Sequence, residues 1–261
     1  MKLRRKLLIT IVPIIVFLGF FYFLWLSPKY VVPILMYHHF GYDDNSLYVT
    51  PGNFAKQMEY IKSNGYNVIS LDELVEGIKN KRKFEQKTLV ITIDDGYEDN
   101  YIYAYPILKK YGYPATIFII TNYIGRKNEH LTWVQIRSML KDNIFFEGHT
   151  KNHIYLPEIE KEEILWDETA GCKKMIEDKL KTSVNYFCYP IGGFTEEIKT
   201  ILKKAGYKGA CTTNRGFVDL NMDIYELKRI KVTNSDTNKP FHFWAKLSGY
   251  YNLFRSKRPG C

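Results

Sequence analysis

Short apolar runs of strand type alternate with stretches of helical spacing along most of the chain. The run 88–93 (TLVITI) is β-branched and almost continuously hydrophobic, as a strand buried on both faces should be. Residues 51–64 instead place Phe54, Met58 and Ile61 on one helical face and end at Gly65, a C-terminal cap. The pattern predicts strands at 30–37, 66–70, 88–93, 115–120, 144–147, 185–189, 209–213 and 227–232. It predicts helices at 51–64, 71–79, 98–111, 132–141, 158–180, 195–205 and from about 240.

Repeated strand–helix units indicate an α/β fold, a parallel sheet with helices outside it. About seven such units favour a closed or nearly closed barrel over an open sheet. The expected architecture is therefore a distorted (β/α)7-type barrel. Because no linker, internal repeat or shift in composition interrupts residues 30–261, we expect them to form one domain.

The first 29 residues have a different character. Residues 7–26 carry no charge over about 20 positions, the length of a transmembrane helix. Lys2, Arg4, Arg5 and Lys6 precede them, and the positive-inside rule then places everything after Lys29 outside the cell. We expect an uncleaved signal anchor in the cell membrane; the alternative is a cleaved signal peptide and a secreted protein.

Charge and cysteine content narrow the function classes. The formal net charge is +9, and four of those positive charges belong to the N-terminal cluster. The remainder suits an anionic wall or membrane surface, but without a motif it does not indicate nucleic-acid binding. No obligate protein partner is indicated. Cys172, Cys188, Cys211 and Cys261 form no C-x-x-C pair, and their disulfide status stays open, with buried free thiols favoured.

Three segments at predicted strand ends carry candidate chemistry, and in barrels of this kind active sites gather there. Thr92-Ile93-Asp94-Asp95-Gly96 has two adjacent carboxylates, one of which could bind a metal while the other moves a proton, although Asp-Asp-Gly is also an ordinary turn. His149 and His153 have the H-x3-H spacing that brings two imidazoles within reach of one ion. Two histidines and one aspartate would leave positions open for water and substrate.

The third segment, Met36-Tyr37-His38-His39, ends the first strand of the barrel. A histidine there could donate a proton from the far side of the substrate. Neighbouring residues of a strand point to opposite faces, so only one of His38 and His39 can face the site. His130 and His242 have no other candidate site residues beside them in the sequence and are interpreted as surface or packing residues.

At these residues the sequence resembles the polysaccharide deacetylases of carbohydrate esterase family four, from about Val32 to Val232. Thr92 to Gly96 matches the family's T-[F/I]-D-D-G motif, and His149 to His153 matches H-[S/T]-x-x-H. The Val32-to-Phe40 segment (VPILMYHHF) resembles the branch acting on poly-N-acetylglucosamine, whose catalytic histidine comes from the first strand. That pattern favours His38 over His39.

One motif departs from the family. Its R-x-P-Y-G element appears here as Cys188-Tyr189-Pro190-Ile191-Gly192, so the arginine that would orient the catalytic aspartate is missing. Ile191 could still supply the backbone N–H that contacts the oxyanion. Arg229, near the end of a later strand, is the candidate substitute for the missing arginine, with a surface ion pair as the alternative.

The resemblance implies a mechanism. Asp95, His149 and His153 would bind a divalent ion, Zn²⁺ first, with Co²⁺, Ni²⁺ or Fe²⁺ also suited to such a site. Asp94 would be the general base and His38 the acid that protonates the departing amine. Trp133 and Tyr189, with Phe194, could form a floor for the sugar or its acetyl methyl group; packing at the barrel rim is the alternative.

The sequence thus predicts hydrolysis of N-acetyl groups from an extracellular polysaccharide that contains N-acetylglucosamine, either poly-N-acetylglucosamine or peptidoglycan. A catalytically inactive glycan-binding protein on the same fold is the alternative. A glycoside hydrolase pairing Asp94 with Glu98 or Glu147 would leave the two histidines without a role. Substrate selection is expected in loops such as 126–130 and 214–223, which the sequence does not let us interpret.

Overall fold

The structure is a computed structural model that describes residues 2–126, 129–214 and 223–253. The chain divides into two compact units, the first ending at Val31 and the second beginning at Val32. The predicted specificity loops at 126–130 and 214–223 lie partly outside the described residues.

The N-terminal unit is helical, but its helix differs from the predicted one. Helix α1 spans Lys2–Phe21 and so contains the four basic residues, and the apolar run then continues as a π-helical segment, Tyr22–Leu26. A 3₁₀ turn at Ser27–Lys29 follows. Among the described residues, no helix combines the length and the apolar character needed to cross a bilayer. The transmembrane anchor expected over 7–26 stays a prediction.

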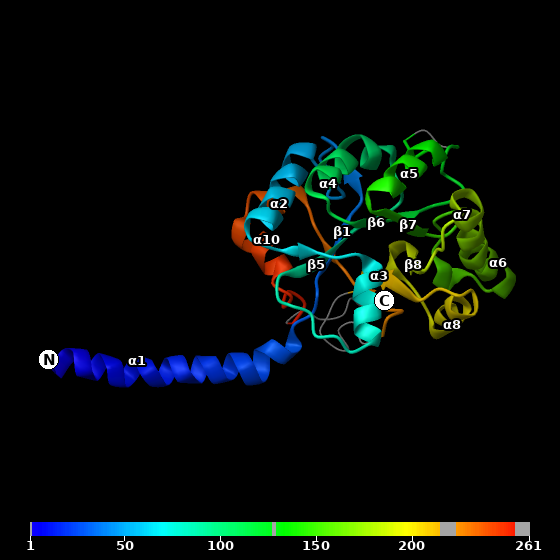
Figure 1. Ribbon diagram of the computed structural model, residues 1–261. Helices are drawn as coiled ribbons and strands as arrows, with labels where there is room; N and C mark the ends of the chain where they lie inside the picture. Colours follow the sequence, from blue (N-terminus) through cyan, green and yellow to red (C-terminus); the bar gives the residue numbers. More distant parts are fainter. Residues whose placement is uncertain (1, 127–128, 215–222, 254–261) are drawn as a thin grey trace. The chain divides into compact units, whose positions relative to one another are not determined.

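The second unit is built around a parallel sheet that curves into a nearly closed barrel (Figure 1). Its strands follow the order β10-β9-β8-β7-β6-β5-β1-β11, and β4 pairs with β5 outside this path. The strands are β1 (Ile34–Tyr37), β4 (Asn67–Val68), β5 (Thr88–Ile93), β6 (Ala115–Ile119), β7 (Ile144–Gly148), β8 (Tyr186–Cys188), β9 (Gly209–Thr212), β10 (Leu227–Lys228) and β11 (Ile230–Lys231). A separate pair joins β2 (His39–Phe40) to β3 (Tyr48–Val49). The expected parallel α/β barrel is confirmed.

One chain segment joins the two ends of the sheet. β10 pairs with β9, and β11 pairs with β1, yet only Arg229 separates β10 from β11. The strand predicted over 227–232 is thus two short strands with different partners. The change of partner places Arg229 where the barrel closes.

Helices surround this barrel, as repeated βα units require. They are α2 (Pro51–Ser63), α3 (Leu71–Lys79), α4 (Tyr105–Tyr111), α5 (Trp133–Met139), α6 (Glu162–Trp166), α7 (Cys172–Leu180), α8 (Glu196–Lys204), α9 (Asn234–Thr237) and α10 (Pro240–Leu247). Two predicted helices are interrupted by π-helical segments, at Asn100–Ala104 before α4 and at Asp167–Gly171 between α6 and α7. The long helix predicted over 158–180 is therefore wrong in its start and its continuity.

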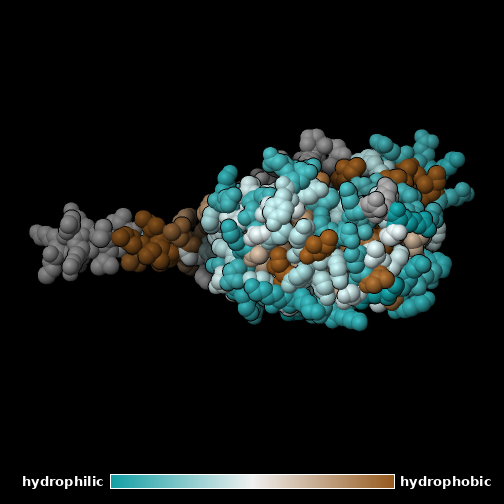
Figure 2. All heavy atoms as spheres, turned by 90° about the horizontal axis from the view of Figure 1, so that it is seen from above, coloured by the Kyte–Doolittle hydropathy of each residue, from teal (hydrophilic) through white to brown (hydrophobic). Residues whose placement is uncertain are grey.

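Buried side chains explain why these elements form. Every residue of β1, β5 and β6 is buried, so their apolar runs fill the barrel and the layer between sheet and helices. The face of this unit seen in Figure 2 is mostly hydrophilic, with hydrophobic residues in small separate groups. Cys172, Cys188 and Cys211 are buried free thiols, whereas Cys261 lies outside the described residues.

Candidate active site

The two adjacent aspartates follow β5 at the carboxyl end of the barrel. The Asp94 N–H still donates to Tyr37 O (2.9 Å), which keeps that residue in line with the sheet. Asp95 then adopts a φ of 73°, as does Gly96. This left-handed turn sends the two neighbouring carboxylates toward different partners, the arrangement that the motif suggested.

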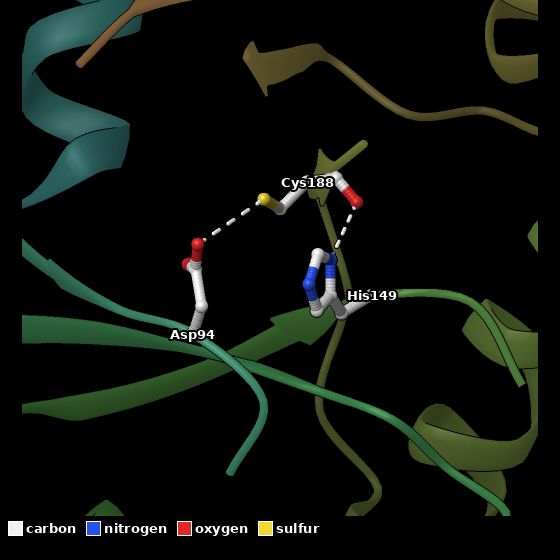
Figure 3. Close-up of side chains that lie close together, drawn as sticks. All are labelled: Asp94, His149 and Cys188. Carbon is white, nitrogen blue, oxygen red and sulfur yellow. Dashed lines mark hydrogen bonds between the residues drawn. The ribbon is translucent and has the colours of Figure 1, made fainter. Parts of the chain in front are cut away.

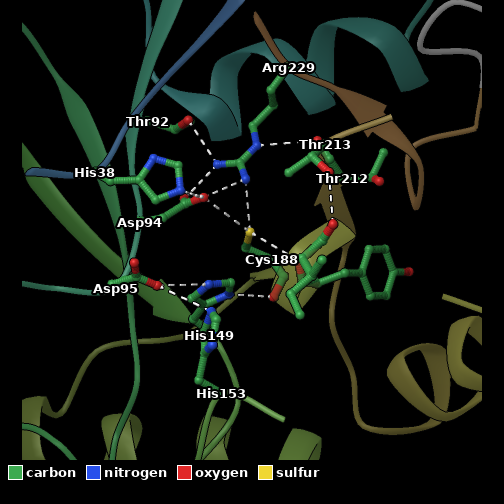
Figure 4. Close-up of polar contacts among 12 residues, drawn as sticks. His38, Thr92, Asp94, Asp95, His149, His153, Cys188, Thr212, Thr213 and Arg229 are labelled. Carbon is green, nitrogen blue, oxygen red and sulfur yellow. Dashed lines mark hydrogen bonds and ion pairs between the residues drawn. The ribbon is translucent and has the colours of Figure 1, made fainter. Parts of the chain in front are cut away.

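Arg229 binds Asp94 through both terminal guanidinium nitrogens. Nη1 donates to Asp94 Oδ1 at 2.6 Å and Nη2 donates to Oδ2 at 2.7 Å, with both side chains almost completely buried (Figure 4). Nη1 also donates to Thr92 Oγ1 (3.1 Å), and Nη2 to Cys188 Sγ (3.0 Å). Such a fork fixes the orientation of a carboxylate as well as its charge. The structure therefore places Arg229 where a substitute for the missing motif arginine must lie.

This pairing sets the charge of Asp94. Burial alone would raise the pKa of the carboxyl, but the Arg229 charge and its hydrogen bonds outweigh burial and hold the pKa below its usual range. Asp94 is consequently an anion at neutral pH.

Asp95, His149 and His153 come together on the other side of the turn. His149 Nε2 lies 3.2 Å and His153 Nε2 lies 3.4 Å from Asp95 Oδ1. That oxygen is buried and accepts no hydrogen bond from the described residues. His149 Nδ1 is 2.7 Å from the carbonyl oxygen of Cys188, which leaves Nε2 to face Asp95. Two imidazole nitrogens and a carboxylate oxygen converging in this way form a set of donors suited to one divalent cation.

A second group, Asp94, His149 and Cys188, also brings three possible ligand atoms together (Figure 3). Its members already have other partners. Both Asp94 oxygens accept from Arg229, and the same guanidinium lies 3.0 Å from Cys188 Sγ. A cation here would be next to a buried positive charge, so the Asp95 group is the better candidate.

The structure separates the two histidines that follow β1. His38 is mostly buried, and its Nε2 lies 3.7 Å from Asp94 Oδ2. His39 turns away: its Nδ1 is 2.8 Å from Asp99 Oδ2, and its ring stacks between those of Tyr48 and Tyr97. Of the pair, only His38 is positioned at the candidate site. Burial lowers the pKa of His38.

Ile191 lies in the turn after β8, and its backbone is in the left-handed region (φ 60°, ψ −4°). Its carbonyl accepts from Thr213 Oγ1 at 2.9 Å, and its side chain is 65% exposed. Asp95, Thr150 and His153 also have positive φ values. Such conformations cost on the order of 1–3 kcal/mol each and cluster at functional sites.

A cavity of about 380 Å³ opens beside these residues. Its walls come from the β1 end, the β8 and β9 loops, β11 and the C-terminal helix region. The lining residues are Met36, His38, Leu47, Ile191, Thr213, Arg229, Ile230, Lys231, Thr233, His242, Lys246, Tyr251 and Asn252. His242, interpreted above as a surface or packing residue, is thus part of a cavity wall.

The predicted sugar floor is only partly compatible with the structure. Tyr189 is fully buried, its hydroxyl donates to Tyr225 O (3.0 Å), and its ring stacks on Phe194. It packs in the core, so the prediction that it contacts substrate is wrong in this structure. The reason is strand alternation: Cys188 faces Arg229, and Tyr189 must point the other way. Trp133 is half-buried at the start of α5, and its role in substrate binding stays a prediction.

Two positioning residues were not predicted, and both belong to π-helical segments. Asn100 is completely buried, and its Nδ2 donates to His38 O at 2.9 Å. Glu168 accepts from the backbone N–H groups of Lys151 and Asn152, at 2.9 and 3.0 Å, and so supports the loop between the two histidines. Single π turns inside helices are frequent at functional sites. No local sequence pattern marked either residue, because their roles depend on burial and on contacts with distant backbone groups.

Comparison with known proteins agrees with this geometry. The family model described as polysaccharide deacetylase matches residues 81–210. A Bacillus subtilis protein named putative polysaccharide deacetylase YxkH is 35% identical over 210 residues, which cover 80% of this chain and 74% of the relative. A Staphylococcus aureus poly-beta-1,6-N-acetyl-D-glucosamine N-deacetylase is 30% identical, with 71% of this chain and 68% of the relative covered.

A solved structure is similar over most of both chains. The Streptococcus pyogenes deacetylase PplD, in complex with acetate, superposes with a TM-score of 0.77 at 28% identity, covering 84% of this chain and 99% of that one. Three observations lead to the same assignment. The sequence is similar, the fold is similar, and the D-D-G and H-x3-H residues lie together at one end of the barrel. This chain belongs to the polysaccharide deacetylase family and is a hydrolase of that family.

Proposed function

We propose that this chain removes N-acetyl groups from an N-acetylglucosamine-containing polysaccharide, releasing acetate, with a divalent metal ion held by Asp95, His149 and His153. The observation that carries the proposal is the pair of neighbouring groups at the end of β5: an Asp94 carboxylate fixed by Arg229, next to a buried N₂O donor set. The similarity to the Staphylococcus aureus poly-beta-1,6-N-acetyl-D-glucosamine N-deacetylase supports poly-N-acetylglucosamine as a substrate.

The donor set fits a hydrolytic metal. Asp95 Oδ1 is a buried oxygen without a hydrogen bond from the described residues, and it faces two imidazole nitrogens. Three protein ligands are the usual number for catalytic Zn²⁺, although Co²⁺, Ni²⁺ and Fe²⁺ accept the same donors. When bound, such an ion lowers the pKa of water and polarises a carbonyl.

Asp94 and His38 both transfer protons, each in a different step of the reaction. Asp94 is held as an anion by Arg229 and takes the proton of the attacking water. His38 Nε2 lies 3.7 Å from Asp94 Oδ2, so a small rotation of the His38 ring lets that proton pass to His38. His38 then delivers it to the nitrogen of the departing amine. Because His38 has a lowered pKa, it starts neutral and can receive this proton.

Ile191 contributes through its backbone. Its left-handed conformation is held by the Thr213 hydroxyl bonded to its carbonyl. The Ile191 N–H is then available as a fixed donor to the oxygen that becomes negative in the tetrahedral intermediate. Preorganised donors of this kind contribute strongly because they need no reorganisation during the reaction.

The test is release of acetate from poly-N-acetylglucosamine and chitooligosaccharides by the purified chain, with and without a chelator. Activity that disappears with chelation and returns with Zn²⁺ or Co²⁺ supports the proposal. An enzyme as active without metal as with it would contradict the metal-dependent mechanism. Binding of these glycans without any acetate release would instead favour the glycan-binding alternative.

We also propose that the catalytic unit acts outside the cell, where such polysaccharides are exposed. The basic cluster before residue 7 and the uncharged sequence 7–26 support export of the chain. Cell fractionation with protease added to intact cells tests this. Degradation of the catalytic unit in intact cells is expected, and full protection would contradict it.

A further inference from the structure

We propose that His242 binds the sugar unit next to the one that is deacetylated, by accepting a hydrogen bond from a hydroxyl or an amide N–H of that unit. This inference rests on the proposed function and adds to it a binding site for the neighbouring part of the polysaccharide. His242 then contributes to the affinity for oligosaccharides and not to the hydrolytic step itself.

His242 lies in the wall of the cavity that contains the catalytic groups. It comes from helix α10, whereas His38 and Arg229, which line the same cavity, follow the barrel strands β1 and β10. Its side chain is 45% exposed, so the ring is open to a ligand. The cavity volume of about 380 Å³ is in the range of small-ligand sites and exceeds the need of a single acetamide group.

The contacts of His242 differ from those of the catalytic carboxylate. His242 is bound to Asp236, whereas Asp94 is bound to Arg229 and lies next to His38. The two histidines therefore belong to different parts of one cavity wall. A sugar whose acetamide reacts at Asp94 leaves His242 to the next unit along the polysaccharide.

Asp236 fixes the orientation of the His242 ring. His242 Nδ1 lies 2.6 Å from Asp236 Oδ1, and the carboxylate is completely buried. Burial raises the pKa of Asp236, but the hydrogen bond and the charge of Lys246 outweigh burial and hold that pKa below its usual range. Because an ionised carboxylate only accepts, Nδ1 carries the hydrogen, and Nε2 is left as the acceptor of the neutral ring.

The charge of Asp236 is compensated without this histidine. Asp236 Oδ2 accepts from Lys246 Nζ at 2.7 Å, from the Thr233 N–H at 2.7 Å and from Thr233 Oγ1 at 3.0 Å. One cation and two neutral donors are suitable partners for a buried carboxylate. The contact at Oδ1 consequently serves to hold the ring, and no residue in the described ranges hydrogen-bonds to His242 Nε2.

A ring that is held at one nitrogen and open at the other is preorganised for binding. Since Asp236 already fixes the ring, a sugar that binds Nε2 does not have to order a mobile side chain. An N-acetylglucosamine unit offers hydroxyl groups and an amide N–H, which are the donors that this acceptor requires. One such hydrogen bond corresponds to about a five- to tenfold change in affinity.

The experiment compares two variants that each keep one nitrogen position of the imidazole. In His242→Asn the amide nitrogen can still donate to Asp236, but nothing replaces Nε2. In His242→Gln the amide group reaches the position of Nε2, but the bond to Asp236 is lost. Acetate release by the full chain with its metal is measured with N-acetylated chitopentaose, which has neighbouring sugars, and with para-nitrophenyl acetate, which has none.

We expect His242→Asn to raise KM for chitopentaose about five- to tenfold with little change in kcat, and to leave hydrolysis of the ester unchanged. His242→Gln should recover part of the affinity, because its amide oxygen can accept from the sugar. A wild-type KM for chitopentaose in His242→Asn would overturn the inference, whether or not His242→Gln is impaired. An equal loss with both substrates would also overturn it, because it would indicate a structural role. No acetate release from chitopentaose by the wild-type chain would instead contradict the proposed function itself.

Discussion

Arg229 and Asp94, 135 residues apart in the sequence, form a buried two-pronged ion pair in which each terminal guanidinium nitrogen binds one carboxylate oxygen. The arginine comes from the junction between β10 and β11, not from the β8 motif that provides it in the wider family. Cys188 fills the position of the family arginine and accepts from Arg229 through its thiol. The site therefore keeps the orienting charge although its source has moved to another strand.

The first prediction concerns this pair. Arg229→Lys keeps the charge but loses the fork, so Asp94 should lose its fixed orientation and kcat should fall on the order of 10²-fold. KM should change much less, because Asp94 acts on water and not on the sugar. Steady-state acetate release measures both constants. A variant with wild-type kcat would show that the fork has no catalytic importance.

A paired exchange tests the relocation directly. Arg229→Cys alone should be inactive and destabilised by about 3–5 kcal/mol, because it leaves a buried carboxylate without its partner. Adding Cys188→Arg puts a guanidinium back beside Asp94 from the strand that the family uses. The double variant should recover measurable activity and part of the lost stability. No gain over Arg229→Cys would indicate that β8 here cannot support the arginine.

The second prediction concerns the different roles of Asp94 and Asp95. Asp94→Asn should lower kcat by about 10²–10⁴-fold and leave metal content unchanged, because Asp94 moves protons. Asp95→Ala should lose both metal and activity. Metal content by mass spectrometry, measured with acetate release on the same samples, checks both statements. Loss of metal from Asp94→Asn would mean that the two roles are assigned wrongly.

The third prediction separates the two histidines. His38→Gln should reduce turnover by about 10²–10⁴-fold, because no proton donor then faces the amine. His39→Gln leaves that position intact and breaks the contact with Asp99, so its main effect should be on thermal stability. Comparing kcat and melting temperature for both variants is the test. The opposite pattern would make His39 the acid.

The fourth prediction is a pH dependence of stability. Burial raises the pKa of Glu147 to about 8, from an ordinary value of 4.5, although two backbone N–H groups donate to it. Between those values the folded chain holds a proton that the unfolded chain releases, so this group makes folding less favourable as pH rises from about 4.5 to 8. Above pH 8 its effect is constant.

Glu147→Gln should remove this dependence, because its amide oxygen can still accept from Asn185 and Tyr186 without titrating. The free energy of unfolding in urea, measured at pH 5.5, 7 and 8.5, should fall more steeply for the wild type than for the variant. Parallel slopes would show that Glu147 does not hold a proton in the folded chain.

The sequence predicted those parts of the site whose residues are close together in the chain. Asp94 with Asp95, and His149 with His153, are each a short motif after an apolar strand, and parallel strands bring such ends to one side of the sheet. Arg229 could only be suggested, because nothing local links it to Asp94. It depends on β10 and β11 changing partners within one residue.

The predictions that failed, and the features that were not predicted, have physical reasons of the same kind. The π-helical segments at Asn100 and Glu168 depend on hydrogen bonds to distant backbone groups, which a helical pattern does not reveal. Tyr189 was expected to form part of an aromatic floor for the sugar, but strand alternation turns its side chain into the core. The cavity wall from α10 was not predicted, since that helix has no role in any recognised motif.

The central claim is that one cation bound by Asp95, His149 and His153 is required for the hydrolysis of acetamides. The most direct measurement titrates Zn²⁺ into metal-free protein while acetate release from an N-acetylglucosamine oligomer is followed. Activity should rise from near zero to a plateau at one ion per chain, and His153→Ala should abolish the rise. Full activity in the metal-free protein, or a plateau unaffected by His153→Ala, would contradict the account.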